Sequence, residues 1–332
     1  MTEEFELIIS TNKDLEKLNN SKILLTGATG TIGSYLLAFL LYYNKRCNAG
    51  IKILCPIRNK LKFHIERCDI NTVEAVPYSS ISELQDKVDY VIHCAGPTRS
   101  ADFINYPVDT ISAIFTDTQI LLDYFKSHGE KAFLYLSSIE IYGDNSDIKK
   151  VFSENSLGQL DNLRIRSCYP ESKRLAENLC MAYAKQFDLN IKIVRLSQIL
   201  GRSKGDNRLI AYLCESAINK EPIHLKSDGK SVKSYCYIMD CISAMLTVLV
   251  RGQATAYNVA NEKIVASVLE LSEYINKKYI GKEVIVENKK DEKYPESSFL
   301  VMNTDKLKAL GWKAHVGMED AFDKLIYNYE KE

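Results

Sequence analysis

The sequence predicts an α/β fold, in which a doubly wound parallel sheet is followed by a smaller C-terminal α/β lobe. From Lys22 onward, short β-rich runs alternate with longer helical runs, which is the order of parallel strands joined by crossover helices. A glycine-rich turn joins the first strand to the first of these helices. The chain has 332 residues, of which 46% are hydrophobic, and this suits one large domain with a smaller lobe.

The elements are expected in a regular order up to Gly201 and in a looser order after it. The predicted strands are Ile23–Leu25, Ile51–Ile57, Tyr90–Ile92, Ala132–Ser137 and Ile191–Leu196, and the helices between them are Ile32–Tyr43, Thr110–Lys126 and Pro170–Phe187. The later predictions are a helix over Arg208–Asn219, a strand pair made of Ile223–Leu225 and Tyr235–Tyr237, a helix over Asp240–Val250, and further helical stretches within 264–332.

Composition excludes several classes of protein. The 43 basic and 43 acidic side chains cancel, so the chain lacks the positive excess that nucleic-acid binding needs. The longest apolar run, Tyr35–Tyr43, is far shorter than the roughly 20 residues of a membrane-spanning helix. The opening Met1–Glu4 is acidic where a secretory signal is basic, so we expect a cytoplasmic protein. Nine cysteines without a Cys-x-x-Cys pair, and histidines on separate segments, predict reduced thiols and no metal site.

A glycine motif, Thr26–Gly33, lies directly between the first strand and the first helix of the sheet. Gly27 suits a tight turn, Gly30 a close approach of the backbone to a pyrophosphate, and Gly33 close packing of the helix. The helix N-terminus attracts the anion. A simple glycine turn is the alternative, but the strand-turn-helix context favours a dinucleotide. The residues assigned to this binding site are Gly27, Thr29, Gly30, Thr31, Ile32 and Gly33.

This motif divides the chain into three segments. Residues 1–20 are expected to form an N-terminal extension, and residues 21–196 a dinucleotide-binding Rossmann-type domain. Residues 197–332 are expected to form mainly a substrate-binding lobe that partly returns to the first domain.

A second motif places Tyr169 and Lys173 four residues apart on one helical face. There the ammonium can lower the pKa of the phenol and let it act as a base toward an alcohol. An ordinary exposed helix often contains this pattern. Ser138, however, ends an apolar strand at the edge of the sheet where ligands bind, and its hydroxyl can orient a carbonyl or an alcohol.

With these motifs the chain resembles extended short-chain dehydrogenases/reductases of the NAD-dependent epimerase/dehydratase group, which act on nucleotide sugars. The resemblance covers about residues 20 to 330 and includes His93–Gly96, Ser137–Gly143, Val232–Asp240, Tyr257–Ala260 and Lys306–Trp312. It implies that Ala95 and Gly96 also bind the cofactor, with Tyr169 and Lys173. It implies substrate contacts by Thr98, Ser138, Ser197, Arg208 and Lys233, and a role in polysaccharide biosynthesis.

The sequence around the second motif resembles most that of UDP-glucuronate decarboxylases, which share a stretch like Arg166–Tyr169 and a glutamate at the position of Glu140. In these enzymes and in sugar 4,6-dehydratases, a Ser/Thr, Tyr and Lys set oxidises carbon 4 to a ketone. The carboxylate then acts on the neighbouring carbon, so the resemblance implies the catalytic set Ser138, Glu140, Tyr169 and Lys173. A structural hydrogen bond or a solvent-facing position is the other interpretation of Glu140.

Three departures from the family pattern bear on the reaction. Dehydratases carry an acid where this chain has Ile139, which cannot donate a proton, so dehydration is disfavoured. Lys233 replaces an arginine that grips the diphosphate, and it cannot bind in a bidentate way. Ser197 stands where an asparagine is common in epimerases and decarboxylases, which leaves the substrate open.

Two features of the sequence favour different cofactors, NADP and NAD. NAD-specific sites end their second strand with an acid, but here Ile57 holds that position and Arg58 follows, which suits a 2′-phosphate. The resemblance favours tightly held NAD, and we place NAD ahead of NADP. Asp69, which we place after a third strand, would approach the adenine or be a surface acid.

Three hypotheses for the function follow. The first is oxidation of a nucleotide sugar at carbon 4 followed by epimerisation or decarboxylation, with the hydride returned. The second is a net NAD(P)-dependent reductase or dehydrogenase acting on a nucleotide-linked sugar or polyol. The third is a non-catalytic dinucleotide-binding interaction protein. The resemblance also implies a homodimer through the helices around 110–126 and 170–187, with burial inside one subunit as the alternative.

Overall fold

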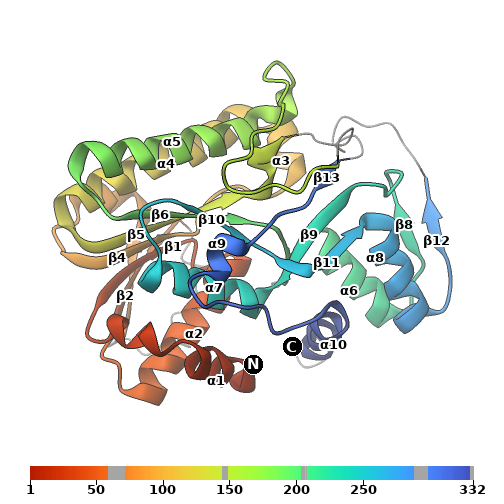
Figure 1. The fold of residues 1–332 in the computed structure, drawn as a ribbon, viewed down its shortest axis with the longest axis horizontal. Helices are drawn as coiled ribbons and strands as arrows, with labels where there is room; N and C mark the ends of the chain where they lie inside the picture. Colours follow the sequence, from red (N-terminus) through yellow and green to blue (C-terminus); the bar gives the residue numbers. More distant parts are fainter. Residues whose placement is uncertain (59–71, 144–148, 203–205, 207, 288–297, 330–332) are drawn as a thin grey trace.

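The computed structural model describes residues 1–58, 72–143, 149–202, 206, 208–287 and 298–329, and its centre is a seven-stranded sheet (Figure 1). The order is β10-β6-β5-β4-β1-β2-β3, and every neighbouring pair is parallel. The strands are β1 (Lys22–Thr26), β2 (Lys52–Ile57), β3 (Val73–Pro77), β4 (Val88–His93), β5 (Gly129–Ser138), β6 (Ile191–Leu196) and β10 (Ala256–Val259). The prediction of a doubly wound parallel sheet is confirmed. The strand order reverses between β1 and β4, where such sheets bind ligands.

Helices cover both faces of this sheet because successive strand residues point to opposite sides. Ile23 and Leu25 of β1 pack with α2 (Thr31–Cys47) and α7 (Ile238–Arg251). Leu24, between them, packs with the helices of the other face. These helices are α4 (Pro107–His128) and α5 (Cys168–Phe187), which lie side by side in Figure 1. The short helix α3 (Ser100–Asn105) precedes α4.

The strand that we placed before Asp69 falls within residues 59–71, which lie outside the described residues. The strand that pairs with β2 is β3, which begins at Val73 and was not predicted. Its five residues are too few, and too mixed in polarity, to stand out as a strand in the sequence. Asp69 itself lies outside the described residues.

The first twenty residues pack against the main domain. They form α1 (Thr2–Thr11) and a 3₁₀ helix, Lys13–Leu18. The Tyr237 hydroxyl donates to Glu4 at 2.8 Å, and Asn12 donates to Thr247 at 3.2 Å. Because α7 lies between the sheet and this N-terminal segment, almost all residues of α7 are buried. The boundaries proposed at residues 20 and 196 stay predictions.

The remaining elements form the smaller lobe. A second sheet has the order β11-β9-β13, with β7 also paired to β9, and β8 pairs with β12. The strands are β7 (Gln198–Leu200), β8 (Ile223–Leu225), β9 (Val232–Tyr237), β11 (Asn261–Ser267), β12 (Val284–Val286) and β13 (Phe299–Leu300), and the helices are α6 (Leu209–Asn219), α8 (Val268–Ile275), α9 (Asp305–Lys308) and α10 (Met318–Tyr329).

The expected pairing of Ile223–Leu225 with Tyr235–Tyr237 is wrong. β8 instead pairs in parallel with β12, and β9 pairs with β7, β11 and β13. Nearness in the sequence suggested this pair, but the partners of the two strands lie 26 to 67 positions away, as tertiary contacts often override local patterns. The lobe also returns to the first sheet through β10.

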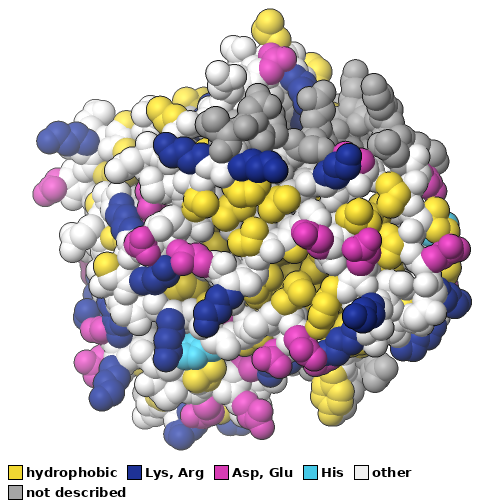
Figure 2. Space-filling view, turned by 45° about the vertical axis from the view of Figure 1, so that its right-hand side comes forward, with side chains coloured by type: hydrophobic (Ala, Val, Ile, Leu, Met, Phe, Trp, Pro, Cys, Tyr) yellow, Lys and Arg dark blue, Asp and Glu magenta, His cyan; other side chains and the backbone are white. Residues whose placement is uncertain are grey.

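The surface agrees with the neutral composition. On the face shown in Figure 2, acidic and basic side chains are interspersed, without a broad field of one sign. No helix among the described residues is long and apolar enough to cross a membrane.

Candidate active site

The glycine loop forms a backbone cradle between β1 and α2. Gly27 has a φ of +72°, and a Cβ there would lie 2.7 Å from the Ala95 nitrogen. A Cβ on Gly33 would lie 2.1 Å from the Gly27 carbonyl oxygen, so both positions need glycine for the loop and helix to close. A Cβ on Gly30 meets only the Gly27 oxygen, at 3.3 Å. Gly30 therefore leaves open space at the N-terminus of α2, which fits a dinucleotide pyrophosphate.

The residues flanking this cradle are placed as follows. Thr29 is exposed and Ile32 is half-buried. The amide of Ala95 donates to the Thr26 hydroxyl at 3.2 Å, which joins the loop after β4 to the end of β1. Gly96 has only the Lys173 ammonium near its missing Cβ, at 3.8 Å. Thr98 lies exposed before α3.

His93 is part of the scaffold at the end of β4. Its Nδ1 lies 2.8 Å from the Thr26 hydroxyl, and its Nε2 lies 3.3 Å from the Thr118 hydroxyl of α4. Burial, with the charges of Lys173 and Arg58, lowers its pKa to about 3. The ring is therefore neutral and joins β1, β4 and α4. No cluster of three potential metal ligands occurs among the described residues.

Ser138 and Tyr169 come together where β5 ends beside the start of α5. The Ser138 hydroxyl accepts from the Glu140 amide at 3.2 Å, and Ser138 also helps to lower the pKa of Tyr169. The Tyr169 ring stacks on Phe103 with the centroids 4.2 Å apart. Burial, with the negative charge of Glu140, raises the pKa of Tyr169 to about 12. Tyr169 is therefore a protonated phenol in this structure.

Lys173 lies one helical turn after Tyr169 on α5 and contacts the backbone of β5. Its Nζ donates to the Leu136 carbonyl at 2.7 Å and lies 4.8 Å from the centre of the Tyr135 ring. Burial lowers its own pKa to about 8. The groups that pull the phenol pKa down are Ser138, Arg166 and Arg208. The ammonium reaches the backbone of β5, beside Gly96, instead of the phenol.

Glu140 is held by an arginine to which the sequence reasoning gave no role. Arg166 binds its carboxylate in a bidentate way, with N–O distances of 3.0 and 2.8 Å. Burial would raise the pKa of Glu140, but the charge and hydrogen bonds of Arg166, with the charge of Lys233, outweigh it and leave the pKa lowered. Glu140 is thus an anion near neutral pH, able to accept a proton and not to donate one.

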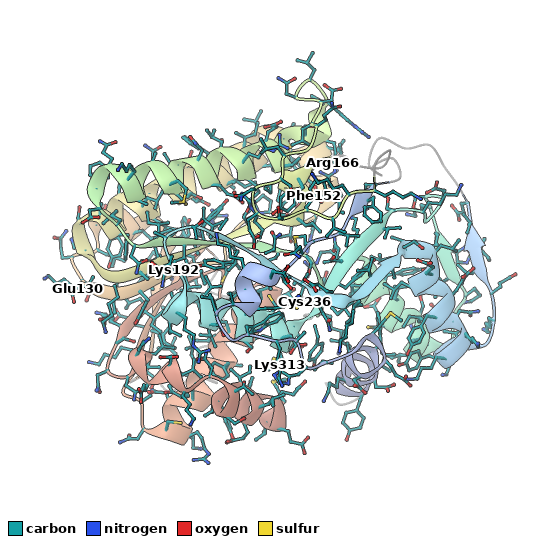
Figure 3. The ribbon with its side chains drawn as sticks, viewed as in Figure 1. Glu130, Phe152, Arg166, Lys192, Cys236 and Lys313 are labelled. Atoms are coloured by element: carbon teal, nitrogen blue, oxygen red, sulfur yellow. The ribbon has the colours of Figure 1, made fainter. Side chains whose placement is uncertain are left out.

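These side chains line a pocket of about 130 Å³ between the end of β5 and the smaller lobe. Its charged lining residues are Glu140, Arg164, Arg166 and Lys233. Arg166 lies where the segment before α5 meets α3, and its guanidinium is 4.9 Å from the centre of the Phe103 ring (Figure 3). Its buried Nε has no hydrogen-bond partner among the described residues, and the same holds for the Ser298 hydroxyl in this pocket and for Ser197. A polar ligand would satisfy such groups.

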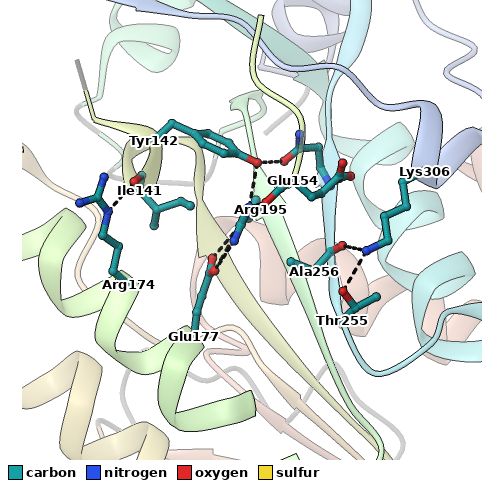
Figure 4. A network of polar contacts seen from close by, with 10 residues as sticks. Ile141, Tyr142, Glu154, Arg174, Glu177, Arg195, Thr255, Ala256 and Lys306 are labelled. Carbon is teal, nitrogen blue, oxygen red and sulfur yellow. Dashed lines mark hydrogen bonds and ion pairs between the residues drawn. The ribbon is translucent and has the colours of Figure 1, made fainter. Parts of the chain in front are cut away.

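A polar network behind this turn fixes its position (Figure 4). The Tyr142 hydroxyl donates to Asn258 at 2.6 Å and accepts from Arg195 at 3.0 Å. Arg195 also pairs with Glu177 of α5 at 2.7 Å, and Arg174 of α5 donates to the Ile141 carbonyl at 2.7 Å. The helix that carries Tyr169 is thereby tied to the turn that carries Glu140.

Two predicted contacts lie at the dinucleotide end. Arg208, expected to bind substrate, donates to the Thr31 hydroxyl at 2.7 Å and pairs with Asp206 at 2.6 Å, so it lies against the start of α2. Arg58 directly follows β2 and forms an ion pair with Asp117 of α4. No sequence pattern pointed to Asp117, because this partner is 59 residues away from Arg58.

The sequence and the fold both match known proteins. Residues 23–260 match the model of the NAD dependent epimerase/dehydratase family. The chain belongs to this family. The resemblance found in the motifs is therefore confirmed, and the family's dependence on NAD agrees with placing NAD ahead of NADP.

Three relatives illustrate the range. The chain is 22% identical over 322 residues to UDP-glucuronic acid decarboxylase 1 of Danio rerio. This match covers 96% of this chain and 75% of that protein. It is 29% identical over 271 residues to dTDP-D-glucose 4,6-dehydratase of Dictyostelium discoideum, covering 76% of this chain and 60% of that protein. A solved structure of UDP-glucuronic acid 4-epimerase from Bacillus cereus, with UDP-glucuronic acid and NAD, has a TM-score of 0.78 at 23% identity and covers 93% of this chain and 99% of that one. The similarity to this solved structure shows that the two chains share a fold.

Proposed function

We propose that this enzyme oxidises carbon 4 of a nucleotide sugar to a transient ketone with bound NAD, then epimerises or decarboxylates the sugar and returns the hydride. The observation that carries the proposal is the anionic Glu140, whose backbone amide donates to the Ser138 hydroxyl and whose charge acts on Tyr169. In this arrangement Ser138 and Tyr169 would act on an alcohol, and Glu140 would act on the carbon next to the resulting ketone.

Each side chain has a distinct task in this scheme. Bound in its oxidised form, the dinucleotide supplies a hydride acceptor and a positive charge at its nicotinamide ring. Tyr169 takes the proton of the carbon-4 hydroxyl, which Ser138 orients by hydrogen bonding. Because burial raises the pKa of Tyr169, this base needs added positive charge, and Lys173 lies one helical turn away on the same helix. Glu140 accepts the proton of the neighbouring carbon during epimerisation, or stabilises the intermediate of decarboxylation.

Loss of water is disfavoured by Ile139. Its side chain is only 1% exposed and packs in an apolar cluster with Tyr142 and Phe152. A dehydratase needs a proton donor for the leaving hydroxyl, and neither Ile139 nor the anionic Glu140 supplies one. The pocket lining has three cationic side chains against one carboxylate, which suits a diphosphate or an acidic sugar.

The experiment has two parts. Mass spectrometry of the small molecules released by denaturing the purified protein should show NAD. Incubation with UDP-glucuronic acid and a panel of other nucleotide sugars, followed by chromatography and NMR, should show a product without net consumption of added dinucleotide. Stoichiometric consumption of NADH or NADPH would instead establish the second hypothesis, a net reductase. Binding without any turnover across the panel would favour the non-catalytic hypothesis.

The proposal extends to assembly and setting. The helices α4 and α5 pack side by side, and on them Val108, Ile111 and Leu175 are 71%, 43% and 49% exposed. A homodimer through these helices would cover this apolar surface. Light scattering on the protein, with Leu175→Glu as the disrupting variant, tests this arrangement. A cytoplasmic location and a role in polysaccharide biosynthesis complete the proposal, to be tested by microscopy of the tagged chain and by polysaccharide analysis of a deletion strain.

A further inference from the structure

The end of β2 contains an arginine whose charge is already neutralised. In Rossmann-type sites this position decides the cofactor, since an acid accepts from the adenosine ribose hydroxyls and an arginine holds a 2′-phosphate. Arg58 directly follows β2, which is the neighbour of β1 and its glycine loop. Taken alone, Arg58 would therefore predict NADP.

The contacts of Arg58 change this expectation. Its guanidinium forms an ion pair with Asp117 and lies 4.6 Å from the centre of the Tyr78 ring. The Asp117 side chain is 12% exposed, whereas that of Arg58 is 56% exposed. The carboxylate is thus fixed on α4, and the guanidinium is held toward it from the strand end.

Asp117 also lies at the correct end of the sheet to affect a cofactor. The next residue on α4, Thr118, contacts His93 at the end of β4, and His93 contacts Thr26 at the end of β1. The Arg58 charge reaches this same histidine, where it helps to lower the pKa. The ion pair therefore stands at the carboxyl edge of β2, β1 and β4, next to the dinucleotide cradle.

We infer that Asp117 is the residue that makes this enzyme select NAD over NADP, in place of the missing acid at the end of β2. A 2′-phosphate carries about −1.5 to −2 charges at pH 7, and it would have to draw Arg58 away from Asp117 or approach an uncompensated carboxylate. The ribose hydroxyls of NAD carry no charge and meet neither cost. The inference rests on the proposed function, because it concerns the dinucleotide of that site.

The test is the ratio of dissociation constants for NADP and NAD, measured by isothermal titration calorimetry on protein freed of nucleotide. Wild type should bind NAD more tightly. Asp117→Asn keeps size and removes the negative charge, so it should tighten NADP binding by about 10-fold or more, since like-charge contact costs several kcal/mol. NAD binding should change by less than about 3-fold, because its ribose is uncharged. Asp123→Asn, the same change farther along α4, is the matched control and should alter neither constant.

Two further variants keep the test decisive. Arg58→Gln/Asp117→Asn should lose the gain in NADP affinity, because no cation remains for the phosphate. Arg58→Gln alone should weaken NADP binding below that of wild type. This variant tests the inference if Asp117→Asn does not fold. An Asp117→Asn variant that changes both constants equally would overturn the inference while leaving the proposed function in place. A wild type that prefers NADP would overturn the inference and also the NAD of the proposed function. If wild type binds neither dinucleotide, the proposed function fails with it.

Discussion

The dinucleotide end and the sugar end of the site differ in how they are made. At the dinucleotide end, the chain forms a cradle from backbone, and Gly27 and Gly33 are required because a side chain would collide with neighbouring backbone. At the sugar end, Glu140, Arg166 and Lys233 come from three separate segments, and their charges determine one another. The first kind of site depends on spacing along the chain, and the second depends on tertiary contacts. This difference predicts that substitutions at the two ends have separable effects.

The largest expected effect is at the dinucleotide end. Gly30→Val should remove dinucleotide binding completely, because the side chain would fill the space at the start of α2. The fold should survive, since the backbone at Gly30 is extended, with φ −85°, and the new Cβ meets only one protein atom. Gly317→Val, where an added Cβ meets nothing within 4 Å, is the control. A folded Gly30→Val protein that still co-purifies with a full complement of dinucleotide would show that the loop has another role.

The next effect is at the sugar end. Tyr169→Phe should keep the stacking on Phe103 and the bound dinucleotide, yet lower turnover by about 10²-fold or more because the acid/base hydroxyl is lost. Tyr183→Phe, on the same helix and hydrogen-bonded to Asp123 at the surface, should leave turnover unchanged. Steady-state kinetics together with a count of bound dinucleotide distinguishes the two ends. Normal turnover in Tyr169→Phe would remove Tyr169 from the mechanism.

A smaller effect concerns pH. Because Arg166 keeps the pKa of Glu140 low against burial, Arg166→Met should raise that pKa, and the carboxylate should then be protonated over a wider acid range. The acid limb of kcat against pH should move upward by about one pH unit or more, so activity is lost first at low pH and recovered as pH rises. Arg164→Met removes the same charge from the same pocket and should leave the limb in place. If the acid limb of kcat does not shift in Arg166→Met, the protonation of Glu140 does not control the rate.

The smallest effect concerns the network behind the turn. Tyr142→Phe removes the hydrogen bonds to Asn258 and from Arg195, so we expect the free energy of unfolding to fall by about 1–3 kcal/mol. Dinucleotide affinity should not change, since the network touches the sugar end alone. Denaturant titration and calorimetry measure the two quantities, and a parallel loss of NAD affinity would contradict the separation of the two ends.

The same difference explains what the sequence could predict. The alternation of strands and helices, the glycine loop and the positions of Ser138, Tyr169 and Lys173 follow from local spacing, and the structure places all of them around the carboxyl edge of one sheet. The pairing of Glu140 with Arg166, and of Arg58 with Asp117, joins residues 26 and 59 positions apart. No periodicity signals such pairs.

The misjudged strand pairing has the same origin. β8 is three residues long and is completed by β12, about sixty positions later, so its partner depends on how the lobe closes. The contact of Lys173 with the Leu136 carbonyl is absent from the sequence prediction for a related reason. Helical spacing gives the face on which a side chain lies, but the β5 carbonyl that the ammonium contacts belongs to another part of the chain.

Deuterium uptake from heavy water into the product tests the central claim most directly, which is that Glu140 acts on the carbon beside a transient ketone. Once a substrate is identified, the wild type should incorporate deuterium from solvent at that carbon. Glu140→Gln keeps the size of the side chain and loses its basicity, so it should still form bound NADH on adding substrate, seen by absorbance, while uptake and product stall. Glu171→Gln, at a half-buried position in the first turn of the same helix as Tyr169, should behave as wild type. Full uptake at the normal rate by Glu140→Gln would contradict the role of Glu140, and no uptake by the wild type would favour a plain dehydrogenase.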